Sequence, residues 1–212
     1  MNFYLISPPN ENKNFNESSF DKITDIIRIT YFQIRPKYKD LKKNQIFAVK
    51  FFEKFKKICE RKNIRFLLND DVHLSKKLGY DGVHLGQNDM DCKKARQILG
   101  KKFLIGISCN DSIYLARKAK IDGADYVAFG PAFNSKTKTT SRKVLNLNEL
   151  KKKNIGIPFT IIGGIDHCNI KKLFNIGANN FSLINSIWNF ENGPVNSAIK
   201  FKKLENIYEN QC

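Results

Sequence analysis

Eight short apolar runs alternate with longer amphipathic stretches along the whole chain, and this pattern constrains the fold more than any other feature. The runs are Phe3–Ile6, Tyr31–Ile34, Arg65–Leu68, Gly82–Leu85, Phe103–Ile107, Tyr126–Phe129, Phe159–Ile162 and Asn180–Ile184. Each has the length of a buried β-strand and is far shorter than the ~20 residues that a membrane helix needs. We therefore expect eight strands in a water-soluble fold.

The stretches between the runs carry apolar residues at helical spacing. This spacing is clearest at Ile46–Lys62, Cys92–Leu99, Ser112–Lys120, His167–Ile176 and Val195–Ile207, and shorter helices are expected around 18–27, 73–78 and 147–154. Strands that alternate with helices favour parallel strands joined by right-handed crossovers. The pattern predicts the α/β class, as a single-domain (β/α)8 TIM barrel over residues 1–212 with a frayed tail at 208–212. A doubly wound open sheet is the alternative, although no GxGxxG follows the first run.

The net charge of +17 invites a nucleic-acid interpretation. The basic residues, however, are spread in pairs such as Lys56-Lys57 and Lys171-Lys172, which is typical of solvated helix faces. No nucleic-acid motif, signal peptide or membrane segment is visible, so we expect no nucleic-acid or membrane partner. The five cysteines are scattered without a CxxC pair, which favours reduced thiols in a cytoplasmic protein.

Polar residues or glycines follow almost every run, where the carboxyl ends of barrel strands build an active site. These segments are Gln33 to Lys37, Asn69-Asp70-Asp71, Gly86 to Asp89, Ser108-Cys109-Asn110, Gly130 to Lys138, Gly163-Gly164 and Asn185-Ser186. Taken singly, each is ordinary turn chemistry. Taken together, they predict one polar active-site opening, the mouth, at the carboxyl end of the barrel.

Asp70 and Asp89 end consecutive strands, which lie about 4.8 Å apart in a sheet, so both carboxylates can reach one ion. Mg²⁺ takes one or two carboxylates and completes its shell with water and phosphate oxygens. Arg35, Lys37 and Lys138 add the positive charge that a diphosphate requires. The sequence thus predicts a Mg²⁺–diphosphate site.

Gly163-Gly164 fits the usual phosphate site of a barrel, where exposed amide groups meet a helix N-terminus. The spacing of His73 and His84 does not suit zinc. His84 alternates with apolar neighbours, which favours a satisfied core or strand-end histidine, and His167 is expected to begin or cap a helix.

The whole pattern resembles the thiamine phosphate synthase family, from Tyr4 to Ile187. The specific matches are QIRPK at 33–37, LLNDDVHLSKKLGYDGVHLGQNDM at 67–90, IGIS at 105–108, GADYVAFGPAFNSKTK at 123–138 and IIGGI at 161–165. The resemblance implies a Mg²⁺-dependent transferase that joins a hydroxymethylpyrimidine diphosphate to a thiazole phosphate and releases diphosphate. It leaves the oligomeric state open, a homo-oligomer included.

The same resemblance assigns roles by position. The pyrimidine diphosphate would be bound by Gln33, Arg35, Lys37, Asn69, Ser108 and Lys138, with Arg35, Lys37, Ser108 and Lys138 as the catalytic groups. Asp70 and Asp89 would hold Mg²⁺. The thiazole phosphate would be held by Ser135, Thr137, Gly164, Ile184 and Asn185. Gly163 and Ser186, next to these positions, are further candidates for binding it.

Departures from the family pattern concentrate at the thiazole-phosphate end. Asn185 stands where the family usually has a phosphate-binding Ser, Asn180 replaces a common Gly, and Ser135 replaces a Thr. Asn110 replaces a common His, which speaks against the closest rival, a thiazole tautomerase of the same fold that needs an acid/base residue. A basic RNA-binding protein on a degenerate barrel is the alternative from another class.

Overall fold

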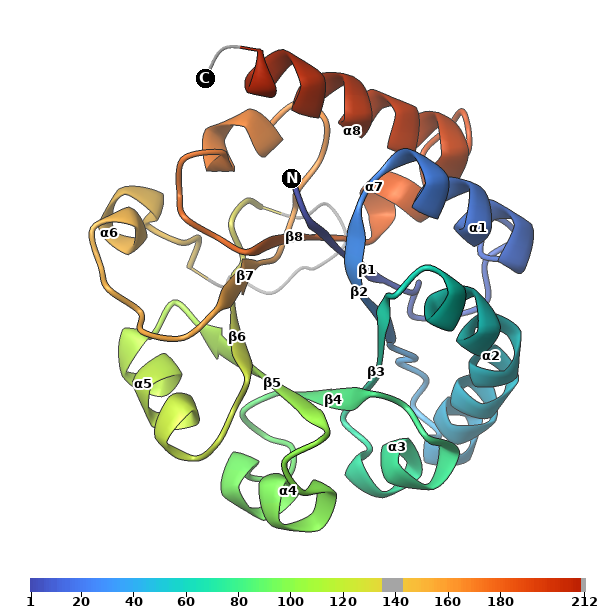
Figure 1. Ribbon diagram of the computed structural model, residues 1–212, viewed down its shortest axis with the longest axis vertical. Helices are drawn as coiled ribbons and strands as arrows, with labels where there is room; N and C mark the ends of the chain where they lie inside the picture. Colours follow the sequence, from blue (N-terminus) through green and yellow to red (C-terminus); the bar gives the residue numbers. More distant parts are fainter. Residues whose placement is uncertain (135–142, 211–212) are drawn as a thin grey trace.

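The computed structural model describes residues 1–134 and 143–210, and within these ranges the strands close into one parallel barrel in sequence order (Figure 1). The strands are β1 (Phe3–Ile6), β2 (Ile29–Ile34), β3 (Arg65–Asn69), β4 (Gly82–Leu85), β5 (Leu104–Asn110), β6 (Tyr126–Phe129), β7 (Phe159–Ile161) and β8 (Asn180–Leu183). β8 pairs with β1 and closes the ring. The predicted single-domain (β/α)8 barrel is confirmed.

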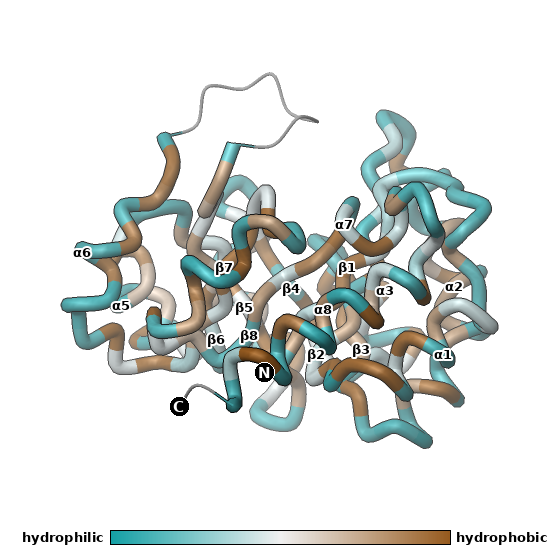
Figure 2. Tube along the Cα trace, turned by 90° about the horizontal axis from the view of Figure 1, so that it is seen from above, coloured by the Kyte–Doolittle hydropathy of each residue, from teal (hydrophilic) through white to brown (hydrophobic). Residues whose placement is uncertain are grey.

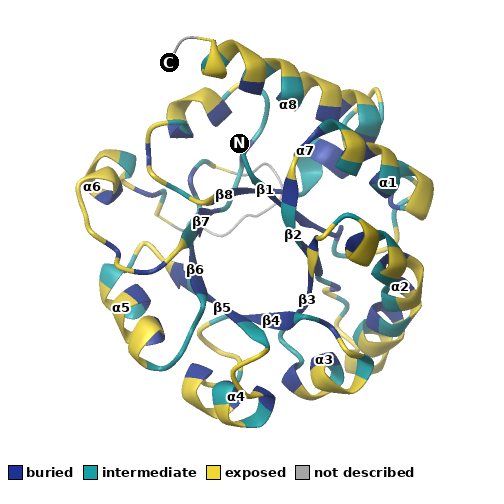
Figure 3. Cartoon of the chain, viewed as in Figure 1, coloured by how far each residue is buried: buried dark blue, intermediate teal, exposed yellow. Residues whose placement is uncertain are grey.

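Helices surround the barrel, and their exposed faces point outward (Figure 3). They are α1 (Glu17–Ile26), α2 (Leu41–Arg61), α3 (Val72–Leu78), α4 (Cys92–Leu99), α5 (Ile113–Ile121), α6 (Leu147–Lys151), the 3-10 helix η1 (Ile170–Leu173), α7 (Asn185–Trp188) and α8 (Pro194–Glu209). Asp71 and Ser112 begin α3 and α5 by accepting hydrogen bonds from backbone N–H groups of the first turn. None of the helices in the described ranges has an apolar stretch that could cross a membrane.

Several elements differ from expectation; α2, for example, begins at Leu41 and not at the predicted Ile46. The helix predicted over His167–Ile176 is only the short η1, because Asp166 and Asn169 form a side-chain-capped turn in its place. α7 directly follows β8 and was not predicted, since a single turn carries no periodic signal. α8 continues to Glu209, beyond the start of the expected tail, and the Tyr208 hydroxyl donates to Asn175 Oδ1 at 2.7 Å.

The buried residues form two clusters. The larger cluster fills the space between the barrel and the helices and is rich in phenylalanine, whereas the smaller one lies inside the barrel and consists of Tyr4, Ile6, Leu67 and Tyr126. Seen from the side, the N-terminus lies at the opposite end of the barrel from α7 (Figure 2). The carboxyl ends of the strands therefore face one mouth, where α7 lies.

Phe55 of α2 lies at the centre of the aromatic packing between α1, α2 and the barrel. It is fully buried, and its ring centroid is 5.1 Å from that of Phe20 and 5.3 Å from that of Phe32. We expect Phe55→Ala to lower the free energy of unfolding by about 3–5 kcal/mol, measured by urea denaturation. The control Ile121→Ala, at a residue that is 83% exposed, changes it by less than about 0.5 kcal/mol. Equal losses in the two variants would contradict this packing.

Candidate active site

The segment after β2 is anchored to the end of β1 through its backbone. The Arg35 N–H donates to Ser7 Oγ, and the Lys37 N–H donates to the Pro9 carbonyl, both at 2.8 Å. Pro36 between them fixes its own φ. These contacts hold the backbone of both cationic residues at the barrel mouth.

Polar groups of β2 and β3 meet inside this mouth. Gln33 is buried, and its side-chain amide donates to Asn69 Oδ1 at 3.3 Å. Asp70 follows with a φ of 64°, a left-handed conformation that Asp tolerates better than most residues. Lys37 Nζ lies 2.5 Å from Asp70 Oδ2. Gln33, Lys37 and Asn69, three of the predicted diphosphate residues, therefore lie together.

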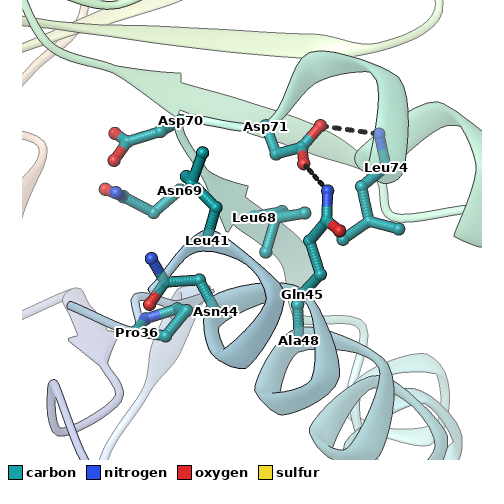
Figure 4. A pocket seen from close by; sticks show the side chains of 10 residues that line it. All are labelled: Pro36, Leu41, Asn44, Gln45, Ala48, Leu68, Asn69, Asp70, Asp71 and Leu74. Carbon is teal, nitrogen blue, oxygen red and sulfur yellow. Dashed lines mark hydrogen bonds between the residues drawn. The ribbon is translucent and has the colours of Figure 1, made fainter. Parts of the chain in front are cut away.

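Asp70 and Asp71 point in different directions (Figure 4). Asn69 and Asp70 lie on one side, whereas Asp71 turns to α3, accepts from the Leu74 N–H at 2.8 Å and contacts Gln45. Asp71 is thus a helix cap. Both groups line a pocket between α2 and the end of β3, which the sequence did not indicate.

Asp89 approaches from the turn after β4. Its Oδ2 accepts from the Gly86 N–H at 2.7 Å, which fixes the carboxylate. Burial raises the pKa of Asp70, the Lys37 ammonium opposes this rise, and the neighbouring Asp89 carboxylate adds to it. No group of three or more His, Cys, Asp and Glu side chains in residues 1–134 and 143–210 could hold a metal ion. Asp70 and Asp89 are therefore a two-carboxylate pair.

Ser108 of β5 is tied to a chain of buried side chains across the barrel interior. Its Oγ lies 2.9 Å from His84 Nε2, His84 Nδ1 lies 2.9 Å from the Tyr126 hydroxyl, and that hydroxyl lies 2.9 Å from the Tyr4 hydroxyl. The expectation that His84 is a satisfied strand-end histidine is confirmed. The link to Ser108 was missed, although Tyr4, His84, Ser108 and Tyr126 all occupy inward positions of their strands.

Burial lowers the pKa of His84 to about 3, so its imidazole is neutral at pH 7. In the unfolded chain the same group ionises near pH 6.5, and the unfolded state binds more protons between these values. We expect wild type to lose stability relative to His84→Gln by up to about 1.4 kcal/mol per pH unit below pH 6.5. Urea denaturation from pH 7 to pH 5 measures this difference, and a constant difference would contradict it.

Gly163 and Gly164 follow β7 in left-handed conformations, with φ of 103° and 66°. A Cβ on Gly163 would lie 2.6 Å from Pro131 Cα, and one on Gly164 would lie 2.7 Å from the Phe133 carbonyl oxygen. Only glycine therefore allows the segment after β6 to pack against this turn. The predicted helix N-terminus behind the glycines is wrong, because η1 begins only at Ile170.

The end of β8 continues through Ile184 into α7. Ile184 packs against the inner cluster, and Asn185 and Ser186 open α7. Within the described part of the chain, Ser186 Oγ is the one buried side-chain oxygen or nitrogen without a hydrogen-bond partner. Ser135, Thr137 and Lys138 lie outside the described residues. Cys109, next to Ser108, is buried in the larger cluster between the barrel and the helices.

The closed parallel barrel, with polar and charged groups gathered at its carboxyl mouth, places the chain among the TIM-barrel enzymes. Residues 3–187 match the family model described as thiamine monophosphate synthase, and the chain belongs to that family. The expected family membership is confirmed.

Curated relatives and solved structures agree with this assignment. The chain is 43% identical to a thiamine-phosphate synthase of Pelagibacter ubique over 96% of this chain and 93% of that protein. It is 37% identical to a thiamine-phosphate synthase of Erythrobacter litoralis over 87% of each chain. A thiamine phosphate pyrophosphorylase from Pyrococcus furiosus superposes with a TM-score of 0.78 at 22% identity, over 96% of this chain and 94% of that one, and shows the shared fold.

Proposed function

We propose that this chain condenses 4-amino-2-methyl-5-hydroxymethylpyrimidine diphosphate with 4-methyl-5-hydroxyethylthiazole phosphate, giving thiamine phosphate and diphosphate. The observation that carries the proposal is the group of Lys37, Asp70 and Asp89 beside the buried Gln33–Asn69 pair at one barrel mouth. Family membership and relatives named thiamine-phosphate synthase support it. The free thiols of Cys59, Cys92, Cys109 and Cys168 agree with a proposed cytoplasmic location.

The proposal includes Mg²⁺ held by Asp70 and Asp89. The Asp89 carboxylate beside Asp70 raises the cost of ionising Asp70, and a bound divalent cation would relieve that cost. Two carboxylates match the preference of Mg²⁺ for a few protein oxygens and several from water and phosphate. When bound, the metal supplies charge that neutralises the diphosphate.

In this proposal the protein residues bind and orient the pyrimidine diphosphate. Arg35 grips the diphosphate through its guanidinium fork, and Lys37 acts as a point charge beside it. Lys138 adds a further cation, while Gln33, Asn69 and Ser108 supply neutral hydrogen-bonding groups. The catalytic contribution of Arg35, Lys37, Ser108 and Lys138 is to stabilise negative charge on the departing diphosphate.

The thiazole phosphate is proposed to bind between the turn after β7 and the end of β8. Gly163 and Gly164 leave their backbone uncovered by any side chain of their own. The Ser186 hydroxyl oxygen, which is buried and has no hydrogen-bond partner among residues 1–134 and 143–210, comes directly after Ile184 and Asn185 in the sequence. Ser135 and Thr137 complete the proposed phosphate group.

The reaction is proposed to be dissociative. The bond between the pyrimidine methylene carbon and the diphosphate oxygen breaks first, and its electron pair leaves with diphosphate. The thiazole nitrogen then donates its lone pair to the methylene carbon and forms the new C–N bond. Such a path needs charge stabilisation and alignment but no protein nucleophile. The competing activity, a thiazole tautomerase, needs a residue that transfers a proton. Neither Asn110 nor His84 supports it, because both ring nitrogens of His84 already have hydrogen-bond partners.

The test is to incubate the purified protein with both substrates and to measure thiamine phosphate and released diphosphate. We expect equal amounts of the two products with Mg²⁺ and a loss of both after chelation. An electron-withdrawing substituent on the pyrimidine should slow the chemical step. Absence of product at saturating Mg²⁺ would overturn the proposed activity. If the unsubstituted pyrimidine releases diphosphate faster than the substituted one, the dissociative path is supported; equal rates would contradict it.

A further inference from the structure

The hydrogen bonds behind Ser108 run through the barrel interior as an unbranched chain. Tyr4, His84 and Tyr126 are buried, and each contact in the chain from Ser108 Oγ to the Tyr4 hydroxyl measures 2.9 Å. Space for the Tyr126 ring exists only because Gly106 has no side chain, since a Cβ there would lie 2.0 Å from Tyr126 Cζ. The barrel is therefore built around this chain of groups.

The positions of the hydrogen atoms follow from counting donors and acceptors. A neutral imidazole has one N–H donor and one acceptor nitrogen, and each phenol has one O–H. The Tyr4 hydroxyl has Tyr126 as its sole hydrogen-bond partner among the described residues, so its hydrogen is satisfied only if Tyr4 donates to Tyr126. Tyr126 must then donate to His84 Nδ1, which leaves the ring hydrogen on Nε2, directed at Ser108 Oγ.

The opposite direction fails on the same count. If Nδ1–H donated to Tyr126, either the Tyr126 hydrogen or the Tyr4 hydrogen would be left buried without an acceptor in the described part of the chain. Leaving a buried donor unpaired costs free energy. One arrangement alone therefore satisfies every hydrogen of the two phenols and the imidazole.

We propose that Tyr4 and Tyr126 fix His84 in its Nε2–H tautomer, so that His84 acts as a positioning residue that presents the Ser108 hydroxyl to substrate as a hydrogen-bond donor. Because Ser108 Oγ already accepts from Nε2–H, its own hydrogen is left for an acceptor atom in the mouth. The role of Ser108 in this inference rests on the proposed function, whereas the tautomer of His84 follows from the hydrogen-bond contacts alone. A diphosphate oxygen or a pyrimidine ring nitrogen has the required acceptor chemistry.

The tautomer can be read in the substrate-free protein by long-range ¹H–¹⁵N correlation spectroscopy. The chain has three histidines, so His73→Gln and His167→Gln assign the His84 signals. We expect the pattern of the Nε2–H tautomer, and we expect it to persist in Tyr31→Phe. Tyr31 is a matched control because its ring stacks on that of Tyr126 at 5.0 Å but its hydroxyl is not part of the chain. An Nδ1–H pattern, or averaging of both tautomers in wild type, would overturn the proposal.

A double-mutant cycle tests whether the chain of groups acts through Ser108. In Tyr126→Phe, His84 Nδ1 loses its donor and Ser108 can turn its hydrogen to Nε2, so we expect kcat/KM to fall about tenfold. In the Ser108→Ala background, the same change should have less than about a twofold effect. A further tenfold loss in that background would refute the role of His84, and thermal unfolding confirms that each variant is folded.

The two measurements separate this inference from the proposed activity. If the protein shows the Nε2–H tautomer but forms no thiamine phosphate, the inferred hydrogen-bond direction stands and the proposed function is overturned. An active protein with the Nδ1–H tautomer would keep the function and overturn the positioning role.

Discussion

Asp89→Asn is expected to lower the rate of thiamine phosphate formation by about a hundredfold to a thousandfold, the loss typical when one preorganised electrostatic group is removed. The variant keeps a side-chain oxygen for the Gly86 N–H, which lies 2.7 Å from Asp89 Oδ2, so the turn after β4 stays intact. Only the charge that faces Asp70 is lost. Steady-state kinetics at saturating Mg²⁺ measure the effect.

Asp71→Asn is the matched control, because it removes the same charge from the next residue along the chain from Asp70. Asp71 caps α3 and points away from the mouth, and Asn caps helices as well as Asp does. We expect its activity to stay within about twofold of wild type. Equal losses in the two variants would show that net charge, rather than the Asp70–Asp89 pair, controls the reaction.

Asp89→Asn should also stabilise the protein in the absence of metal. Removing the Asp89 charge relieves its repulsion of Asp70, which we expect to raise the free energy of unfolding by about 0.5–1 kcal/mol. Adding Mg²⁺ should then raise the melting temperature of wild type but not that of Asp89→Asn. A metal-free variant less stable than wild type would contradict the repulsion between the two carboxylates.

Gly106→Ala is expected to lower the free energy of unfolding by about 3 kcal/mol, at the upper end of the usual cost of overpacking. The added Cβ would lie 2.0 Å from Tyr126 Cζ and 2.3 Å from its hydroxyl oxygen, so the ring must leave its place. His84 Nδ1 then loses its hydrogen-bond partner, so activity is expected to fall together with stability. Urea denaturation measures the loss.

Tyr126→Leu provides the matched background for this change, because leucine lacks the ring atoms that a Cβ on Gly106 would meet. In that background we expect Gly106→Ala to cost less than about 1 kcal/mol. If Gly106→Ala still lowers the free energy of unfolding by about 3 kcal/mol in Tyr126→Leu, the strain lies in the backbone of β5 and not at the Tyr126 ring.

The strands could be predicted closely because each is a short apolar run bounded by polar turn residues. β4 and β6 match the expected ranges, and β1 does as well. The region after β7 was harder to predict. Its apolar residues at helical spacing predicted a helix over His167–Ile176, but side-chain hydrogen bonds from Asp166 and Asn169 favour a turn and a short η1.

At the candidate site, sequence order was enough to bring Lys37, Asp70 and Asp89 to one mouth, because parallel strands share their carboxyl ends. The hydrogen-bonded chain behind Ser108 could not be predicted in the same way. It joins residues of β1, β4, β5 and β6 across the barrel interior, and such contacts depend on strand register and on the space left by Gly106. Inward alternation of Tyr4, His84 and Tyr126 was the available signal.

Calorimetric titration with inorganic diphosphate tests the proposed Mg²⁺–diphosphate site most directly. We expect wild type and Asp71→Asn to bind diphosphate with Mg²⁺ present and at least about a hundredfold more weakly after chelation. Asp89→Asn should bind weakly under both conditions. Equal affinity of wild type for diphosphate with and without Mg²⁺ would contradict the metal site at Asp70 and Asp89.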